Sequence, residues 1–325
     1  MPVSRSATLL SPARPVLLAG SCFSDNMARR MKQSLWLACH SLGVLYNPLS
    51  IAKALRMALL DMDGGMQEFS DSLFEDSSGI WHSHLFSSVM SARKPEMARN
   101  LYAAMSGRMR ECAADAGALV VTFGTAVCYY LADRRDYVAG NCHKQPSGAY
   151  VRRRLDISEI ADTWIRLLQE IHARYPRMRV IFTVSPVRHL KDGFEENARS
   201  KATLLLAVES ICRADEAAEY FPAYEIMQDD LRDYRFYGPD LAHPSEEAVE
   251  YIWTHFKDTY LDEAGKSMLR EGASIYGSWH HRPNMRLLTA EDESMEAERK
   301  ERVKNRYLDF RKRHGPLVAP LWSEE

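Results

Sequence analysis

Two short segments that lie far apart in the sequence carry residues suited to nucleophilic chemistry. In the first, an apolar run that starts at Pro15 ends at Gly20 and is followed by Ser21. The residues after Ser21 repeat apolar side chains every three to four positions, which predicts a helix, so Ser21 stands at a strand-to-helix corner. The unpaired N–H groups of a helix start stabilise a developing negative charge. This position favours a nucleophilic serine, although serine is also a common N-cap residue.

The second segment holds Asp240 and His243, three residues apart, before an amphipathic helix expected over residues 244–261. A carboxylate at this spacing keeps an imidazole in one tautomer and stabilises its cation. Together with Ser21, the pair would supply the nucleophile, the base and the orienting acid of a serine hydrolase. The same pair also fits an ordinary hydrogen-bonded turn.

The two segments together resemble the SGNH (GDSL-like) hydrolase superfamily. Within it, the run Gly20-Ser21-Cys22-Phe23-Ser24 closely matches the motif that names the GSCFA domain family. Further blocks are similar to those of the family and come in the same order, at residues 43–48, 122–126, 141–144, 185–189, 197–204 and 220–253. The resemblance covers roughly residues 7–260.

This resemblance implies a serine-dependent ester hydrolase in which Ser21 attacks, His243 moves the proton and Asp240 orients His243. The superfamily implies removal of a small acyl group such as acetyl from a carbohydrate or another small-molecule ester. Two other functions stay open. One is an acyltransferase that uses the same serine, and the other is a non-catalytic ligand-binding domain that kept the fold.

The resemblance also implies a set of hydrogen-bond donors for the oxyanion. The Ser21 backbone N–H is one candidate, and Gly43 matches the glycine of the second block. A third donor in the superfamily is the asparagine of a Gly-x-Asn block. Here that block starts at Gly124 and has Ala126 in place of the asparagine. One lost donor typically slows such a reaction about a hundred- to thousandfold, so a hydrolase needs a substitute.

Several polar residues near the expected site are candidates for that substitute. Asn47 is the first choice, although it equally fits the cap of a helix that starts at residue 48. Asn141 and the Thr125 hydroxyl are the others. Arg188 and His189 follow a predicted strand and would bind an anionic or sugar substrate, or else make ordinary surface hydrogen bonds.

The elements that must position these residues alternate between strand and helix. Apolar runs predict strands at residues 15–20, 35–39, 118–123, 178–184 and 220–227. Helical periodicity is found at residues 25–33, 48–61, 95–113, 157–175, 197–214 and 244–261. This alternation predicts a three-layer α/β/α, doubly wound and mainly parallel sheet of the flavodoxin-like kind, whose ligands bind beyond the carboxyl ends of the strands. Residues 64–91 and 132–150 interrupt the pattern and are expected to be substrate walls or ordinary loops.

The length of 325 residues suits one α/β domain over residues 1–262 and a C-terminal extension over residues 263–325. Within the extension, residues 272–283 are expected to be irregular. Residues 290–314 read as a charged helix with Thr289 as its cap and one thin apolar stripe.

Composition argues against several classes of protein. The 42 basic and 44 acidic residues give a net charge of −2, which offers no electrostatic case for binding nucleic acid or a membrane. We expect no cofactor and no metal, because neither the pair His82 and His84 nor the pair His280 and His281 has partners at a recognisable spacing. Six cysteines without a Cys-x-x-Cys motif, and a start without a signal-peptide pattern, predict reduced thiols in a cytoplasmic protein. The oligomeric state stays open.

Overall fold

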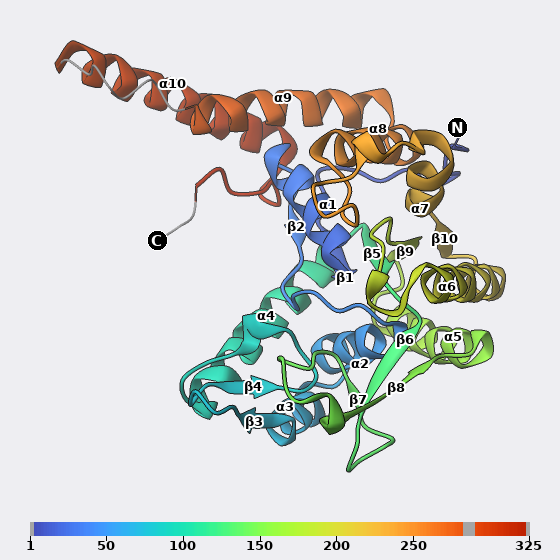
Figure 1. Cartoon of the computed structure of the whole chain (residues 1–325). Helices are drawn as coiled ribbons and strands as arrows, with labels where there is room; N and C mark the ends of the chain where they lie inside the picture. Colours follow the sequence, from blue (N-terminus) through green and yellow to red (C-terminus); the bar gives the residue numbers. More distant parts are fainter. Residues whose placement is uncertain (1–2, 282–289, 323–325) are drawn as a thin grey trace.

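Five parallel strands form the central sheet of the protein (Figure 1). The computed structural model describes residues 3–281 and 290–322. The strand order across the sheet is β10-β9-β5-β1-β2. The bounds are Val16–Gly20 for β1, Ala38–Cys39 for β2, Ala118–Phe123 for β5, Arg179–Val184 for β9 and Ala218–Tyr220 for β10.

The helices of the main domain follow the strands in turn. Their bounds are Cys22–Gln33 for α1, Pro48–Leu59 for α2, Pro95–Asp115 for α4, Ile157–Arg174 for α5, Phe194–Ala214 for α6 and Glu246–Tyr260 for α8. The chain leaves β1 toward β2 on one side and then returns to place β5 on the other side of β1. The loops after β1 and β5 therefore diverge, and this divergence opens a crevice at the carboxyl edge of the sheet.

Alternating side chains cover the two faces of the sheet. In β5, Leu119, Val121 and Phe123 belong to one buried cluster, whereas Ala118 and Val120 belong to another. The first cluster includes residues of α2, α4, α5 and α6, and the second includes residues of α1 and α8. Because both faces are covered, the strands read as nearly continuous apolar runs, which is why the sequence predicts them well.

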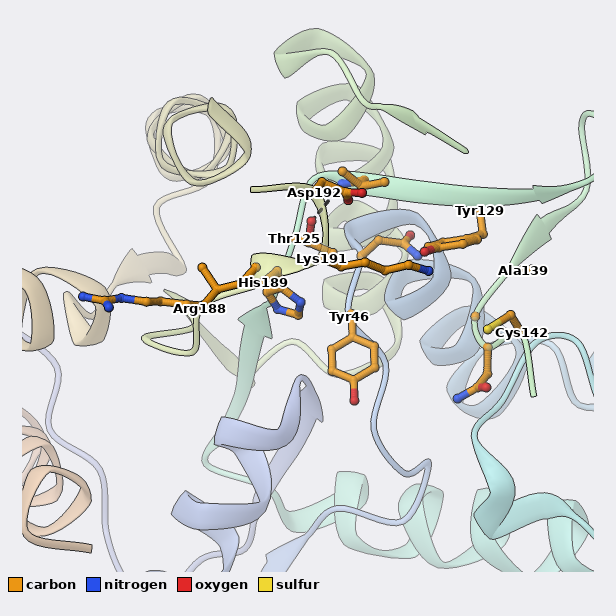
Figure 2. Close-up of a pocket in the computed structure, with 14 residues that line it drawn as sticks. Tyr46, Thr125, Tyr129, Ala139, Cys142, Arg188, His189, Lys191 and Asp192 are labelled. Atoms are coloured by element: carbon orange, nitrogen blue, oxygen red, sulfur yellow. Dashed lines mark hydrogen bonds between the residues drawn. The ribbon is translucent and has the colours of Figure 1, made fainter. Parts of the chain in front are cut away.

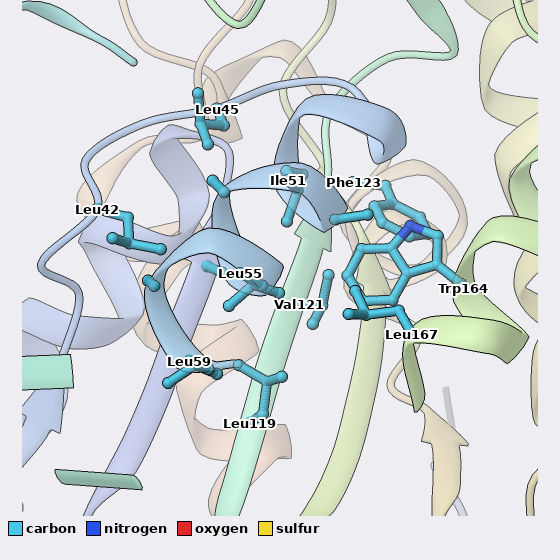
Figure 3. Packing of buried hydrophobic residues seen from close by; sticks show 14 of the residues in the cluster. Leu42, Leu45, Ile51, Leu55, Leu59, Leu119, Val121, Phe123, Trp164 and Leu167 are labelled. Carbon is cyan, nitrogen blue, oxygen red and sulfur yellow. The ribbon is translucent and has the colours of Figure 1, made fainter. Parts of the chain in front are cut away.

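The first face is shown in Figure 3, where Leu119 and Val121 of β5 lie beside Leu55 of α2 and Trp164 of α5. The indole N–H of Trp164 donates a hydrogen bond of 3.1 Å to the carbonyl oxygen of Pro48. This bond satisfies a buried polar atom and ties the start of α2 to α5. The helix that follows the Asn47 loop is thereby fixed against the core.

The prediction of a strand over residues 220–227 is wrong. Strand β10 ends at Tyr220, and after Pro222 the chain turns into a short helix, Ala223–Glu225, and a π-helical turn, Ile226–Leu231. Ala223, Ile226 and Met227 are buried at helical spacing. A short apolar run fits a strand and a helical turn equally well, so periodicity alone does not separate them.

The two interrupting segments form small sheets of their own. Residues 64–91 contain most of helix α3 (Met62–Asp71) and an antiparallel hairpin of β3 (Leu73–Glu75) and β4 (Trp81–Ser83). Strands β6 (Val127–Leu131), β7 (Val138–Ala139) and β8 (Tyr150–Arg154) form a second antiparallel sheet in the order β7-β6-β8. The backbone N–H of Gly140 donates to the carbonyl of His84, 2.8 Å away, and so joins the two units. Both lie in the lower half of the view in Figure 1.

The C-terminal extension is more regular than the sequence predicts. Residues 272–283 were expected to be irregular, but helix α9 runs from Glu263 to His280. A Cβ on Gly272 would lie only 2.2 Å from the carbonyl oxygen of Ser34, so this glycine serves a close approach to the end of α1 and not a loop.

Helix α10 (Ala290–His314) contacts α9 and projects from the main body in Figure 1. Its residues Val303, Tyr307 and Phe310 are buried in one cluster with Leu35, whereas Met295 of the expected stripe is exposed. The predicted cap Thr289 lies outside the described residues. Among the helices of the described segments, none combines the length and the apolar character needed to cross a membrane.

Candidate functional site

Ser21 stands at the corner between β1 and α1, as the sequence predicts. Gly20 before it has φ +135°, and a Cβ there would lie 2.2 Å from the carbonyl oxygen of Thr122 on the neighbouring strand. Only glycine fits this backbone conformation and this approach. Ser21 is the N-cap of α1: its Oγ accepts a hydrogen bond of 3.4 Å from the N–H of Phe23. Its side chain is fully buried.

The Ser21 backbone N–H, a candidate oxyanion donor, already has an acceptor. It donates to the carbonyl oxygen of Thr122 at 3.1 Å and thus extends the pairing of β1 with β5 by one residue. This hydrogen bond fixes the corner in position. It also leaves the N–H committed to the sheet in this conformation.

The Asp240–His243 pair is formed. Asp240 Oδ2 lies 2.5 Å from His243 Nδ1, and Oδ1 of the same carboxylate accepts the backbone N–H groups of Ala242 and His243 at 3.0 Å each. These backbone donors first, and then the imidazole, hold the pKa of Asp240 well below its usual range. Both side chains are about half exposed. The carbonyl of Ala242 accepts the N–H of Arg188 at 3.1 Å, which docks this loop on the one that follows β9.

His189, rather than His243, borders the Ser21 side chain. A Cβ built on Gly124 would lie 3.2 Å from His189 Nε2 and 3.3 Å from Ser21 Cβ, so the two residues border the same small space. Within the described part of the chain, no hydrogen bond joins Ser21 to His243, and the buried Nε2 of His189 has no hydrogen-bond partner. The His189 ring meets Tyr46 edge-on with the ring centres 5.6 Å apart (Figure 2).

Burial sets the protonation state of His189. Desolvation first, and then electrostatic interactions with Lys201 and His243, lower the pKa of His189 to about 4. The imidazole is therefore neutral at physiological pH. A neutral imidazole carries one N–H, which it can donate, and one free ring nitrogen.

Lys201 is a functional-site residue that the sequence interpretation missed. Its Nζ donates to the carbonyl oxygens of Gly124 and Ser185, 2.7 Å away in each case, which are the residues just after β5 and β9. The side chain is 1% exposed, and burial lowers its pKa to about 7. A signal was present: Lys201 lies on the buried face of α6 in register with Leu204 and Val208. A lysine in an apolar stripe is rarely buried without a specific task.

A pocket of about 380 Å³ lies beside this corner, beyond the carboxyl ends of β1 and β5. In Figure 2, His189 and Tyr46 face one another at one side of the pocket, and Tyr129 and Cys142 lie on the other. Of the described residues, the lining includes His189 but neither Ser21 nor His243. The lining residues are Tyr46, Asn47, Thr125, Val127, Tyr129, Ala139, Gly140, Asn141, Cys142, Arg188, His189, Leu190, Lys191 and Asp192.

Asn47 and Asn141 line the pocket, but each has a local structural task. Asn47 Oδ1 accepts the N–H of Ser50 at 2.9 Å and caps α2. Asn141 Oδ1 accepts the N–H of His143 at 2.8 Å within its own turn. The structure thus shows the helix cap at Asn47, which is formed by Oδ1, whereas the amide N–H groups that an oxyanion donor would use take no part in it.

The two remaining candidates are Thr125 and Gly43. The Thr125 hydroxyl lies 3.1 Å from the Ser200 hydroxyl. Gly43 packs against Ser87 and Val89, each of which would lie 2.5 Å from a Cβ on Gly43.

The side chains of Arg188 and His189 point in different directions. In Figure 2 it points away from the His189 ring. Its guanidinium lies over the rings of Tyr237, at 4.1 Å, and Tyr234, at 5.4 Å. Arg188 therefore borders the side of the site that carries the Asp240–His243 loop, where the N–H of Arg188 bonds Ala242.

The histidines and cysteines do not assemble a metal site. In residues 3–281 and 290–322, no group of three or more histidine, cysteine, aspartate or glutamate side chains is arranged to hold an ion. His82 bonds instead to Asp76, at 3.1 Å, and to Ser91, at 2.7 Å. The six cysteines are free, and burial raises the pKa of the Cys22 thiol next to the corner. Burial thus works against a reactive thiolate at Cys22.

Comparison with known proteins agrees with the resemblance drawn from the motifs. The profile of the GSCFA family matches residues 15–256, a span that includes Ser21, His189 and the Asp240–His243 pair. No curated protein matches the sequence. Among solved structures, the chain is similar to a carbohydrate esterase family 2 enzyme with a carbohydrate binding domain from Corynascus thermopiles (Myceliophthora fergusii). That match has a TM-score of 0.27 and 18% identity, and it covers 49% of this chain and 37% of that one. A TM-score this low carries no weight for fold or activity.

Proposed function

The chain belongs to the GSCFA family, and on that premise we propose that it is a serine-dependent ester hydrolase of the SGNH type with Ser21 as its nucleophile. The Asp240–His243 pair carries this proposal. Its 2.5 Å hydrogen bond is already formed, and its loop is docked at the sheet edge where Ser21 stands. Nucleophilic ester cleavage requires an imidazole that is paired with a carboxylate and can reach a serine hydroxyl.

The reaction follows from these three side chains. Asp240 accepts the Nδ1–H of His243, which leaves Nε2 free to accept a proton. Ser21 Oγ attacks the ester carbonyl carbon while His243 Nε2 takes the hydroxyl proton, and the carbonyl electron pair moves onto oxygen. The electron pair on that oxygen then re-forms the carbonyl bond and expels the alcohol, which takes the proton from His243. Water repeats the sequence on the acyl-enzyme. We propose that Oγ, which accepts from Phe23 in the free protein, turns toward His243 when the ester binds.

Burial and pocket chemistry support a small acyl group on a polar substrate. Ser21 is fully buried, so little room is open beside it, which favours a short acyl chain such as acetyl. The pocket combines the aromatic rings of Tyr46 and Tyr129 with the polar groups of Asn141 and Asp192. Aromatic faces with a few polar groups suit a sugar ring. We therefore propose an acetylated carbohydrate or a similar small-molecule ester as the substrate.

The second candidate function is a non-catalytic ligand-binding domain. The full burial of Ser21 and its absence from the pocket lining favour it. In that case the pocket would bind a small polar molecule, and Ser21 would serve only as the cap of α1.

Labelling of the serine tests the two functions against each other. We expect a small fluorophosphonate to modify Ser21, as located by mass spectrometry of the digested protein. Ser21→Ala should abolish labelling and lower the hydrolysis of 4-nitrophenyl acetate roughly a thousandfold or more. Ser24→Ala is the matched control, because Ser24 is equally buried on α1 and bonds only within the core, to Thr122 at 2.9 Å. An unchanged rate in Ser21→Ala would overturn the hydrolase proposal and favour the binding domain.

A further inference from the structure

The tetrahedral intermediate proposed above needs a donor at its negatively charged oxygen. The superfamily's asparagine is absent at Ala126, and the Ser21 N–H is committed to Thr122. Asn47 caps α2 through Oδ1 alone, which leaves its amide N–H groups free, and the Thr125 hydroxyl lies 3.1 Å from that of Ser200. A group that could take the place of the asparagine should therefore be close to Ser21, shielded from water and free of a partner within the protein.

His189 meets these three conditions. Its Nε2 and the Ser21 Cβ both border the space that a side chain on Gly124 would fill, at 3.2 and 3.3 Å. Nε2 is buried and has no hydrogen-bond partner. An unpaired buried polar atom destabilises the fold unless a ligand atom completes its hydrogen bond. The oxygen of an ester carbonyl attacked by Ser21 has to lie close to Ser21, and therefore within reach of a donor that borders the same residue.

We propose that His189 donates an Nε2–H hydrogen bond to this oxygen and so replaces the missing asparagine. The inference rests on the proposed function, because it concerns the oxyanion formed by Ser21. His189 keeps its proton throughout, and the proton of the Ser21 hydroxyl still passes to His243. The hydrogen bond from His189 is stronger in the transition state than in the bound ester, because negative charge develops on the oxygen only as the bond to Ser21 forms.

The surroundings of His189 hold it for this task. Its backbone N–H donates to Asn197 Oδ1 at 2.9 Å, and Tyr46 packs edge-on against the ring. Lys201 anchors the Gly124 carbonyl on the opposite side of that residue. Electrostatic interactions with Lys201 and His243 add to burial in disfavouring the imidazolium form of His189, and Asp192 opposes them. A fixed, neutral donor loses little energy by reorganising during the reaction.

Two amide substitutions separate donation from proton transfer. The amide nitrogen of glutamine reaches the position of imidazole Nε2, whereas that of asparagine reaches only the position of Nδ1. Neither amide acts as a base near neutral pH. We expect His189→Asn and His189→Ala to lower kcat for 4-nitrophenyl acetate about a hundred- to thousandfold with KM nearly unchanged. His189→Gln should recover most of the rate, to within about tenfold of the wild type.

The outcomes are distinct from those that test the proposed function. If Ser21→Ala removes the activity but His189→Ala does not, only the role of His189 is overturned. If His189→Gln is as slow as His189→Asn, His189 does not act as a simple donor, and the inference fails. A wild type that neither hydrolyses the ester nor reacts with the fluorophosphonate overturns both proposals.

Thermal unfolding of each variant verifies that it is folded. His172→Gln is the matched control, since His172 lies at the end of α5 and bonds Asp215 at 3.0 Å, away from the pocket lining. Its hydrolytic rate should equal that of the wild type.

Discussion

Two histidines lie at the carboxyl edge of the same sheet in opposite environments. His243 is about half exposed, and its Nδ1 is paired with Asp240. His189 is largely buried, its Nε2 has no partner, and its interaction with the buried Lys201 further lowers its pKa. A carboxylate supports the positive charge that a base acquires, whereas burial beside a cation opposes it. Equal side chains are thus suited to unequal tasks: His243 to accept a proton, and His189 to remain neutral and donate a hydrogen bond.

The largest expected effect is that of replacing His243, the proposed base. His243→Gln should lower kcat/KM for 4-nitrophenyl acetate roughly a thousandfold or more, because an amide does not accept the serine proton. The same substitution at His189 should be tolerated. Asp240→Asn should lower kcat/KM by a factor about one to two orders of magnitude smaller than His243→Gln does, since it removes only the orienting carboxylate. Retained activity in His243→Gln, with activity lost in His189→Gln, would exchange the two roles.

The next effect concerns Lys201, the buried lysine that acts on His189. Its pKa is about 7 in the folded protein and 10.5 ordinarily, so the unfolded chain binds more protons between these pH values. Stability of the wild type should therefore rise with pH across this window and be lost again as pH falls toward 7. Lys201→Met lacks this dependence. We expect the unfolding free energy of the wild type, relative to Lys201→Met, to increase by about 3 kcal/mol from pH 7 to pH 10.

Denaturant titrations at several pH values measure that difference. Lys191→Met is the matched control, because Lys191 is exposed and should show no such pH-dependent difference. A constant difference between wild type and Lys201→Met would mean that Lys201 is not held as a buried amine. The same variant leaves the carbonyls of Gly124 and Ser185 without their donor, so its hydrolytic rate should fall about tenfold or more.

The smallest expected effect distinguishes His189 from Asn47. Asn47→Ala removes the cap of α2 and should lower the unfolding free energy by about 1 kcal/mol, with turnover of the folded enzyme unchanged. Thermal melting and ester hydrolysis are measured on the same sample. A rate that falls a hundredfold at an unaltered melting temperature would instead make Asn47 the oxyanion donor.

Much of the fold could be predicted because its strands are buried on both faces. Strand β5 was predicted with its observed bounds, and β1 and β9 to within a residue. The errors come from residues whose local pattern has two solutions. Gly272 suggested a loop, but it allows α9 to approach Ser34. Strand β8 was missed because its exposed positions are mostly arginine, and each of Arg152, Arg153 and Arg154 pairs with a carboxylate.

The site could be predicted only as far as its local chemistry extends. The Ser21 corner depends on Gly20, and the Asp240–His243 bond depends on a spacing of three residues, so both were visible in the sequence. The unpaired Nε2 of His189 and the carbonyl partners of Lys201 depend on distant segments that meet at the sheet edge. Such contacts arise from tertiary structure, and no local pattern in one sequence encodes them.

The tight fit at Gly20 also has an evolutionary consequence. A methyl group at this position would sit 2.2 Å from the Thr122 oxygen, so even alanine would force β1 and β5 apart. Ser21, in contrast, is small and buried, and its backbone bond to Thr122 does not depend on its side chain. A descendant of this protein can therefore lose the hydroxyl in a single substitution and keep its architecture. Exchange of the neighbouring Gly20, in contrast, would disrupt the architecture and the serine corner together. We therefore expect relatives that lack the proposed activity to keep the glycine and to carry another residue in place of the serine.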